Sequence, residues 1–229
     1  MNVYFTQIDP PDQDTAEALA KKGWRCRHLP FRCVEWLRTR TPDMSAYDVV
    51  VMSSKRAARW YLEQQGLHAK PLAVVGGATS AILAGHELVF GDDPPANAKE
   101  LAQRLAKQLP KEARLLFVRG EIASKSIPDG LSGFALDQLT VYRTPLHKID
   151  PVYQGGMVYF QAPGSVRDFH AAFTNKPTLA GAIGSATQEA LVLLGWPVHF
   201  RPSRPETAVM IDEIPSPEQL LEQIGDGTL

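Results

Sequence analysis

The sequence has few cysteines, no excess of charge of either sign and no long apolar run. Its two cysteines, Cys26 and Cys33, have a spacing that fits neither a zinc site nor a redox pair. The formal net charge of −1 leaves no overall field to attract nucleic acid. No stretch approaches the roughly 20 apolar residues that span a bilayer, and the opening segment MNVYFTQIDPPDQDTAEALA lacks the regions of a signal peptide. We therefore expect a cytoplasmic protein with free thiols that binds neither nucleic acid nor a membrane.

The chain does have enough apolar residues to fill a core. Hydrophobic residues make up 44% of the sequence and charged residues 21%, which is the balance of a folded chain rather than a disordered one. A length of 229 residues fits one large domain or two small ones.

A short turn rich in glycine and threonine occurs twice. The segments AVVGGATSAILAG, residues 73–85, and GAIGSATQEALVL, residues 181–193, both pass from an apolar stretch through small residues into a helical pattern. Gly76 and Gly184 lie 108 positions apart, and other matched segments keep offsets of up to 110. A period this long indicates two related halves, which means a domain duplication rather than a solenoid.

Short apolar runs alternate with helical patterns along the whole chain. The expected strands are Val3–Gln7, Trp24–Leu29, Val49–Met52, Leu72–Val75, Leu115–Val118, Ala135–Val141, Met157–Phe160, Leu179–Ile183 and Pro197–Phe200. The expected helices are Asp14–Lys22, Ser54–Gln65, Thr79–Ala84, Lys99–Gln108, Ala123–Leu131, Ser165–Phe173, Thr187–Leu194 and Pro217–Ile224. This alternation is typical of open parallel sheets covered by helices, so we expect an α/β fold with one such sheet in each half.

Small and hydroxyl residues gather where several expected strands end. In open parallel sheets, ligands bind outside these carboxyl ends, where helix N-termini present free N–H groups. Such turns are Ser53–Ser54, Gly76–Gly77, Gly120, Gln161–Ser165 and Gly184–Ser185. They predict an anion site made of backbone amides and hydroxyls, although the same residues also suit helix caps and tight turns. Neither a dinucleotide fingerprint nor a P-loop is present.

The order of these motifs resembles that of the uroporphyrinogen-III synthase family. The matching segments are VVMSSKRAARWY, AVVGGATSAIL, LLFVRGEIASKSIPDGL, LTVYRTP, VYFQAPGSVRDF and AIGSATQEALVLLGWPV, which follow one another between residues 50 and 198. The chain departs from the family pattern at Met52, where a threonine is usual, and at Gln161 and Ala162, where hydroxyl residues are usual. These departures leave open whether the substrate contacts are altered.

The resemblance implies a division of the chain that sequence order does not suggest. Sequence order alone would cut the chain near residue 112, whereas the family crosses between its lobes twice. If this chain follows the family's arrangement, the two extended linkers fall near residues 31–38 and 142–150. The implied lobes are a discontinuous one, 1–35 plus 142–229, and an inserted one, 36–141. Both would be similar, open, flavodoxin-like parallel-sheet units with a cleft between them.

The resemblance also implies an activity. The family consists of hydro-lyases of tetrapyrrole and heme biosynthesis, which close the linear tetrapyrrole hydroxymethylbilane to uroporphyrinogen III, invert ring D and release water. No cofactor and no metal are implied, and the six histidines show no metal-site spacing. A monomer is expected, with the linear tetrapyrrole as its substrate, and a transient contact with hydroxymethylbilane synthase stays open.

The candidate site residues follow from the matched motifs. Tyr142 matches the tyrosine of the family's Val-Tyr-x-Thr motif and would donate a proton to the leaving hydroxyl; the alternative is a tyrosine that only packs in a linker. The expected substrate-binding residues are Ser53, Lys55, Gly76, Gly77, Thr79, Arg119, Gly120, Lys125, Gly164, Ser165, Gly184, Ser185 and Thr187. For the basic residues among them, a solvated surface role is an open alternative.

Two other classes of function remain open. One is a non-catalytic tetrapyrrole-binding or regulatory relative with the same fold, which release of uroporphyrinogen III would exclude. The other is a periplasmic-type two-domain solute receptor, against which the absence of a signal peptide argues.

Overall fold

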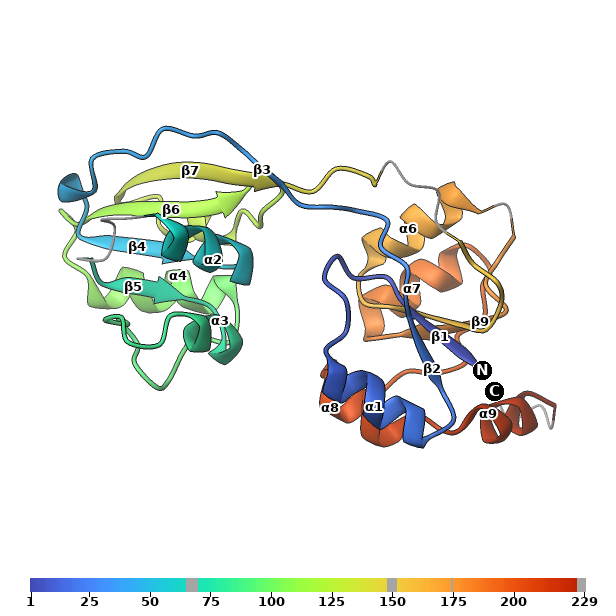
Figure 1. Cartoon of the computed structure of the whole chain (residues 1–229). Coiled ribbons are helices and arrows are strands. Elements are labelled where there is room, and N and C mark those ends of the chain that lie inside the picture. Colours follow the sequence, from blue (N-terminus) through green and yellow to red (C-terminus); the bar gives the residue numbers. More distant parts are fainter. Residues whose placement is uncertain (65–69, 148–151, 174, 226–229) are drawn as a thin grey trace. The chain divides into compact units, whose positions relative to one another are not determined.

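The computed structural model describes residues 1–64, 70–147, 152–173 and 175–225 (Figure 1). The chain divides into two compact units, which are described one at a time. The discontinuous lobe is Met1–Cys33 with Pro145–Leu229, and the inserted lobe is Val34–Thr144.

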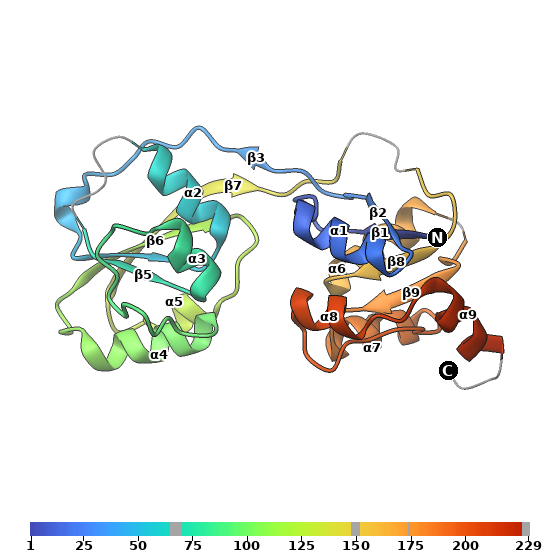
Figure 2. The same ribbon diagram turned by 60° about the horizontal axis from the view of Figure 1, so that its bottom comes forward.

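The discontinuous lobe is built on a parallel sheet of four strands in the order β2-β1-β8-β9. The strands are β1 (Asn2–Phe5), β2 (Arg25–His28), β8 (Met157–Phe160) and β9 (Leu179–Ala182). Helices α6 (Pro163–Ala172) and α7 (Ser185–Leu193) pack on one face, and α1 (Gln13–Lys21), α8 (Thr207–Glu213) and α9 (Pro217–Gly225) lie on the other (Figures 1 and 2). Strand β8 is buried on both faces, since alternate residues join different core clusters.

The inserted lobe has five strands in the order β3-β7-β6-β4-β5. Strands β4 (Val49–Met52), β5 (Leu72–Val74), β6 (Arg114–Gly120) and β7 (Ala135–Arg143) are parallel, and β3 (Glu35–Trp36) is antiparallel to β7 at one edge. Helices α2 (Lys55–Glu63) and α3 (Gly77–Ile82) cover one face, and α4 (Ala98–Gln108) and α5 (Ser126–Gly130) cover the other. A 3₁₀ turn, Met44–Ala46, precedes β4. Within the described ranges, each helix falls short of the length and apolar character that a membrane crossing requires.

The expected α/β class with two parallel-sheet lobes is confirmed. The two related halves of the sequence do not coincide with the lobes, because each lobe takes one βαβ unit from each half. Units β1-α1-β2 and β8-α6-β9 share one sheet, and units β4-α2-β5 and β6-α5-β7 share the other. A cut near residue 112 would separate β4 from its hydrogen-bonded neighbour β6. The two glycine–threonine turns therefore lie in different lobes.

The strand expected at Pro197–Phe200 was wrong. The segment makes only an isolated parallel bridge between Phe200 and Gly181 at the edge of the sheet. Proline has no N–H to donate to a ladder, so Pro197 donates no hydrogen bond to this edge of the sheet.

Helix α8 was not expected from the sequence. It is seven residues long and includes the β-branched residues Thr207, Val209 and Ile211, so its local helical signal is weak. Tertiary contacts hold its C-terminal end, where Lys22 Nζ donates to the carbonyl of Ile214 at 3.0 Å and Trp24 Nε1 donates to that of Pro215 at 2.8 Å.

The segments expected as two linkers are paired with each other where the structure describes them. Strand β3 lies within 31–38 and pairs with Tyr142 and Arg143 at the end of β7. An isolated antiparallel bridge joins Arg32 to Leu146. Residues 148–150 of the second expected linker lie outside the described residues. Tyr142 is therefore a strand residue and not a linker residue.

A pH-dependent stability is expected at the edge of the discontinuous lobe's sheet. The ring Nδ1 of His199 accepts a hydrogen bond from the backbone N–H of Ala180 at 3.0 Å. Burial lowers the pKa of His199, and the charge of Lys176 acts in the same direction. Because the folded pKa lies below the unfolded value, the contribution to stability is complete above about pH 6.5 and is lost as the pH falls from there through the folded pKa. We expect the thermal midpoint of the wild type to fall more steeply below pH 6.5 than that of His199→Asn. Equal slopes for the two proteins would contradict this assignment.

Candidate functional site

Each sheet has a switch point between two of its inner strands. In the inserted lobe the switch point lies between β4 and β6, and in the discontinuous lobe it lies between β1 and β8. Open α/β sheets bind ligands outside the carboxyl ends of the strands at such points. Ser53 and Ser54 follow β4, and Gly120 ends β6, so all three lie at the inserted lobe's switch point.

The expected site residues divide between the two lobes. Those in the inserted lobe are Ser53, Lys55, Gly76, Gly77, Thr79, Arg119, Gly120, Lys125 and Tyr142. Those in the discontinuous lobe are Gly164, Ser165, Gly184, Ser185 and Thr187.

Tyr142 is seated at the inserted lobe's switch point. The residue is only 7% exposed, and its hydroxyl donates a hydrogen bond to Ser54 Oγ at 3.1 Å. Its ring packs edge-on against the ring of Trp36, with 5.8 Å between centroids. The phenol also lies directly over Gly120, where an added Cβ would come within 2.5 Å of Tyr142 Cζ. The structure thus joins Tyr142 and Gly120, both expected from the sequence, to Ser54.

A β-bulge turns Tyr142 toward this position. Strands β6 and β7 pair in register up to Arg119 and Thr140, but the next pair is Gly120 with Tyr142, so Val141 is an extra residue on β7. As a result Val141 and Tyr142, although adjacent, both pack into the core cluster beneath α2 and α3. Bulges often re-aim a side chain beside a functional site.

Ser54, rather than Ser53, is the hydroxyl residue that the fold uses here. Ser54 is the N-cap of α2, and its Oγ accepts from the N–H of Ala57 at 3.1 Å. Sequence reasoning included both serines in the turn after β4 but chose only Ser53 as a site residue. The signal that identifies Ser54 is its position directly before the helical pattern, where serine is a preferred cap.

The two glycine–threonine turns lead into helices α3 and α7, which begin in similar ways. Thr79 and Thr187 occupy the first turns of α3 and α7, are 5% and 2% exposed, and have hydroxyls without a hydrogen-bond partner among the described residues. Neither helix has a side-chain cap, because Gly76 and Gly184 stand at the N-cap positions. Gly76 has φ +74°, which requires glycine, whereas Gly184 is extended. The first-turn N–H groups therefore have no capping side chain to compete with a ligand.

A surface hollow adjoins each twin helix. One, of about 510 Å³, borders α3 and is lined in part by Gly77, Ser80 and His86. The other, also of about 510 Å³, borders α7 and is lined by Ser185, Gln188, Glu189, Val192 and Leu193. The expected residues Gly77 and Ser185 are exposed at the start of each hollow.

The turn after β8 is organised differently from the turn after β4. Helix α6 has Ala162 at its N-cap, which gives no side-chain cap, and Ser165 Oγ donates back to the carbonyl of Ala162 at 2.8 Å. Gly164 has open space where a Cβ would lie, apart from Arg167 Nη2 at 3.9 Å. Gln161 has a buried Oε1 with no hydrogen-bond partner within the described chain. A buried acceptor without a donor is costly, so this departure from the family pattern leaves an unused acceptor at the discontinuous lobe's switch point.

The basic residues expected in the site differ in how far the protein restrains their side chains. Arg119 donates to the carbonyls of Gly120 and Glu121 at 3.0 and 2.9 Å and to Gln138 Oε1 at 2.7 Å, so protein acceptors occupy three of its five N–H groups. Lys55 and Lys125 are exposed. Arg119 is therefore held in place at the end of β6, and the two lysines lie in solvent.

Glu35, the first residue of β3, forms an ion pair with Arg143 of β7. Arg143 Nε and Nη2 both lie 2.7 Å from Glu35 Oε2, which raises the pKa of Arg143, mainly through the hydrogen bond. The pair is exposed, so it contributes little to stability. It joins β3 to β7 directly beside Tyr142.

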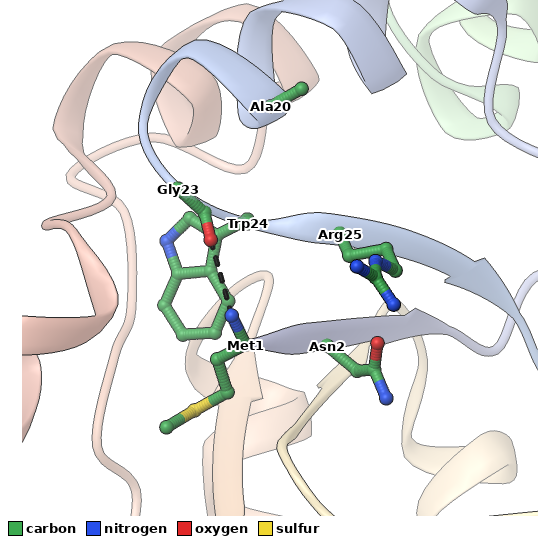
Figure 3. Close-up of a pocket in the computed structure, with 6 residues that line it drawn as sticks. All are labelled: Met1, Asn2, Ala20, Gly23, Trp24 and Arg25. Carbon is green, nitrogen blue, oxygen red and sulfur yellow. Dashed lines mark hydrogen bonds between the residues drawn. The ribbon is translucent and has the colours of Figure 1, made fainter.

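One further cavity lies at the opposite end of the discontinuous lobe's sheet (Figure 3). It measures about 470 Å³ and is lined by Met1, Asn2, Ala20, Gly23, Trp24 and Arg25. Asn2 and Arg25 are the first residues of β1 and β2, so this cavity faces the amino ends of the strands. It lies away from the carboxyl ends, where the candidate site residues are.

Comparisons with known proteins identify the family and the fold. The model of the family described as "Uroporphyrinogen-III synthase HemD" matches residues 13–212. Among solved structures, uroporphyrinogen-III synthetase from Helicobacter pylori superposes with a TM-score of 0.67 at 16% identity, covering 92% of this chain and 96% of that one. A mutant uroporphyrinogen III synthase from the extremely thermophilic bacterium Thermus thermophilus gives a TM-score of 0.56 at 15% identity, covering 97% and 99%. No curated protein sequence matches the chain significantly.

The structural matches have low sequence identity, so by themselves they establish only the fold. The family model covers most of the chain and includes the turns after β4, β5, β6, β8 and β9 together with Tyr142. The chain belongs to the uroporphyrinogen-III synthase HemD family.

Proposed function

We propose that this protein is a uroporphyrinogen-III synthase, a hydro-lyase that cyclises hydroxymethylbilane to uroporphyrinogen III. The observation that carries the proposal is the position of the Tyr142 side chain. In a chain of this family, a nearly buried phenol lies at a sheet switch point, hydrogen-bonded to a helix cap. Such a phenol is a weak acid in a sheltered position, which suits a very poor leaving group.

In the proposed reaction, Tyr142 assists the departure of the substrate's terminal hydroxyl. The C–O bond breaks with its electron pair going to oxygen, and the phenol supplies the proton that completes a water molecule. The resulting azafulvene is attacked by the substituted carbon of ring D to give a spiro intermediate. Breaking and re-forming one bond of that intermediate inverts ring D. The final ring closure releases a proton that restores the phenol, so the protein is unchanged overall.

The protein's main task in this proposal is to hold a flexible chain that carries eight carboxylates. The uncapped first turns of α3 and α7 offer N–H groups and the hydroxyls of Thr79 and Thr187. Arg119 and the exposed lysines Lys55 and Lys125 add positive charge in the inserted lobe. Catalysis then depends mostly on how the protein orients the substrate. If the linear tetrapyrrole is not held in a folded conformation, its ring closure gives the symmetric type I isomer.

The twin threonines provide a test of substrate binding. Thr79→Val and Thr187→Val keep the shape of each side chain and remove a hydroxyl that has no partner among the described residues. We expect each substitution to lower kcat/KM by a factor equivalent to roughly 1–3 kcal/mol, the usual effect of leaving a ligand group unpaired. The thermal midpoint should change little. Full activity combined with a lower midpoint would assign both residues to the fold alone.

The proposal itself is tested by a coupled assay. Porphobilinogen and hydroxymethylbilane synthase generate the linear substrate, the protein is added, and the oxidised products are separated into type I and type III isomers. A predominant type III product supports the proposal. Type I alone, with retained binding of the linear tetrapyrrole, would instead favour a non-catalytic tetrapyrrole-binding relative.

A further inference from the structure

Ser54 makes two hydrogen bonds that connect a helix terminus to the phenol of Tyr142. As the N-cap of α2, its Oγ accepts from the N–H of Ala57 at 3.1 Å. The same Oγ accepts the O–H of Tyr142 at 3.1 Å, from a strand 88 positions away in the sequence. Both contacts lie within the inserted lobe, at the switch point between β4 and β6.

These two contacts use the acceptor capacity of Ser54 and leave its own proton available. A serine hydroxyl has two acceptor positions and one donor. The Ala57 N–H and the Tyr142 O–H fill both acceptor positions while the phenol is protonated. The Ser54 proton has no acceptor among the described residues.

We propose that Ser54 is a positioning residue that orients the phenol of Tyr142 and then stabilises its conjugate base. The proposal rests on the proposed function, because it concerns the proton that Tyr142 delivers. Before transfer, the Tyr142 O–H donates to Ser54 Oγ. After the phenol has given its proton to the leaving hydroxyl, the Ser54 O–H turns and donates to the phenolate oxygen. Ser54 keeps its own proton throughout, so only the direction of one hydrogen bond changes.

Two physical effects favour this reversal. A hydrogen bond to a charged oxygen is roughly twice as strong as one between neutral groups, so the bond gains strength when the phenolate forms. The phenolate also lies beside the N-terminus of the nine-residue helix α2, where the positive end of the helix dipole stabilises negative charge. Both effects grow as negative charge develops on the phenol oxygen during proton transfer, so they favour the transition state over the bound substrate.

A substitution series with isomer analysis tests the proposal. Ser54→Ala is expected to lower kcat by about 10- to 100-fold, the range for a lost hydrogen bond to a charged group, with little change in KM. Ser54→Thr retains the hydroxyl and should restore most of the activity. In a Tyr142→Phe background, Ser54→Ala should cause no further loss of kcat, because the residue acts only through the phenol.

Asn97→Ala is the matched control for helix capping. Asn97 caps α4 in the same lobe through a 3.0 Å hydrogen bond from the N–H of Glu100, and it takes no part in the proposed site. Both alanine variants should lower the thermal midpoint, but only Ser54→Ala should slow turnover. Turnover of Ser54→Ala equal to that of Asn97→Ala, or an undiminished loss in the Tyr142→Phe background, would overturn the role of Ser54. Wild-type protein that forms no type III isomer would overturn the proposed function itself, before any variant is compared.

Discussion

Tyr142→Phe is expected to slow turnover by about 10²–10⁴-fold, the usual contribution of a general acid. The substitution removes one oxygen atom and leaves the ring between Gly120 and Trp36. Binding of an unreactive linear tetrapyrrole should change little, since one hydroxyl adds little to contacts with eight carboxylates. The residual product should remain mainly type III, because the isomer is decided by how the protein holds the linear tetrapyrrole and not by the proton donor.

Tyr47→Phe is a matched control for this experiment. Tyr47 is also a buried tyrosine of the inserted lobe, 6% exposed, and its hydroxyl donates to Asp137 Oδ2 at 2.8 Å. It precedes β4 and therefore lies at the amino ends of the strands. Each variant should lose about 1 kcal/mol of stability with its hydrogen bond, but only Tyr142→Phe should lose turnover. Similar kinetics for the two variants would remove Tyr142 from the mechanism and leave orientation as the main source of catalysis.

The strands of both sheets were largely predictable because the chemistry that forms them is local. Val49–Met52 and Met157–Phe160 are continuous apolar runs, and both are strands with the expected bounds. Helix α8 and the irregular edge at Pro197–Phe200 were not predictable in the same way, because contacts with distant residues decide them.

The division of the chain was not readable from its periodicity. The repeat at 108–110 positions is real in the sequence, but each lobe combines one βαβ unit from each half. Where the chain crosses from one lobe to the other depends on which strands pair. Pairing between strands such as β1 and β8 joins residues that are far apart in the sequence. Only the resemblance to a family implied a crossing of the chain between lobes.

The candidate site was predictable in its parts but not in its geometry. Tyr142 and Gly120 were both expected, yet nothing in the sequence shows that one lies over the other. Their contact depends on the extra residue Val141 in β7, and a bulge of this kind has no distinctive sequence pattern. Ser53 was chosen over Ser54 because two adjacent serines in the same turn offered the same chemistry, and only the start of α2 distinguishes them.

The contact between Gly120 and Tyr142 leads to the second large effect. The backbone of Gly120 does not have a positive φ, so alanine is compatible with its conformation. The obstacle is steric, because a Cβ would lie 2.5 Å from Tyr142 Cζ and 2.9 Å from its hydroxyl oxygen. The ring is nearly buried and cannot simply move into solvent. Gly120→Ala should therefore displace the phenol from Ser54 while leaving every functional group in the protein.

We expect Gly120→Ala to lower turnover by about 100-fold, the effect of misplacing a catalytic group by about 1 Å, and to destabilise the fold by about 1–3 kcal/mol through overpacking. Gly130→Ala separates these two effects, since its added Cβ would meet Ala102 Cβ at 2.7 Å in the same lobe without touching Tyr142. Steady-state kinetics and thermal unfolding of both variants provide the measurement. If the phenol must sit over Gly120 to act, the two variants will lose similar stability and Gly120→Ala alone will lose turnover. Equal turnover in the two variants would mean that the close fit of Tyr142 over Gly120 serves packing and not proton transfer.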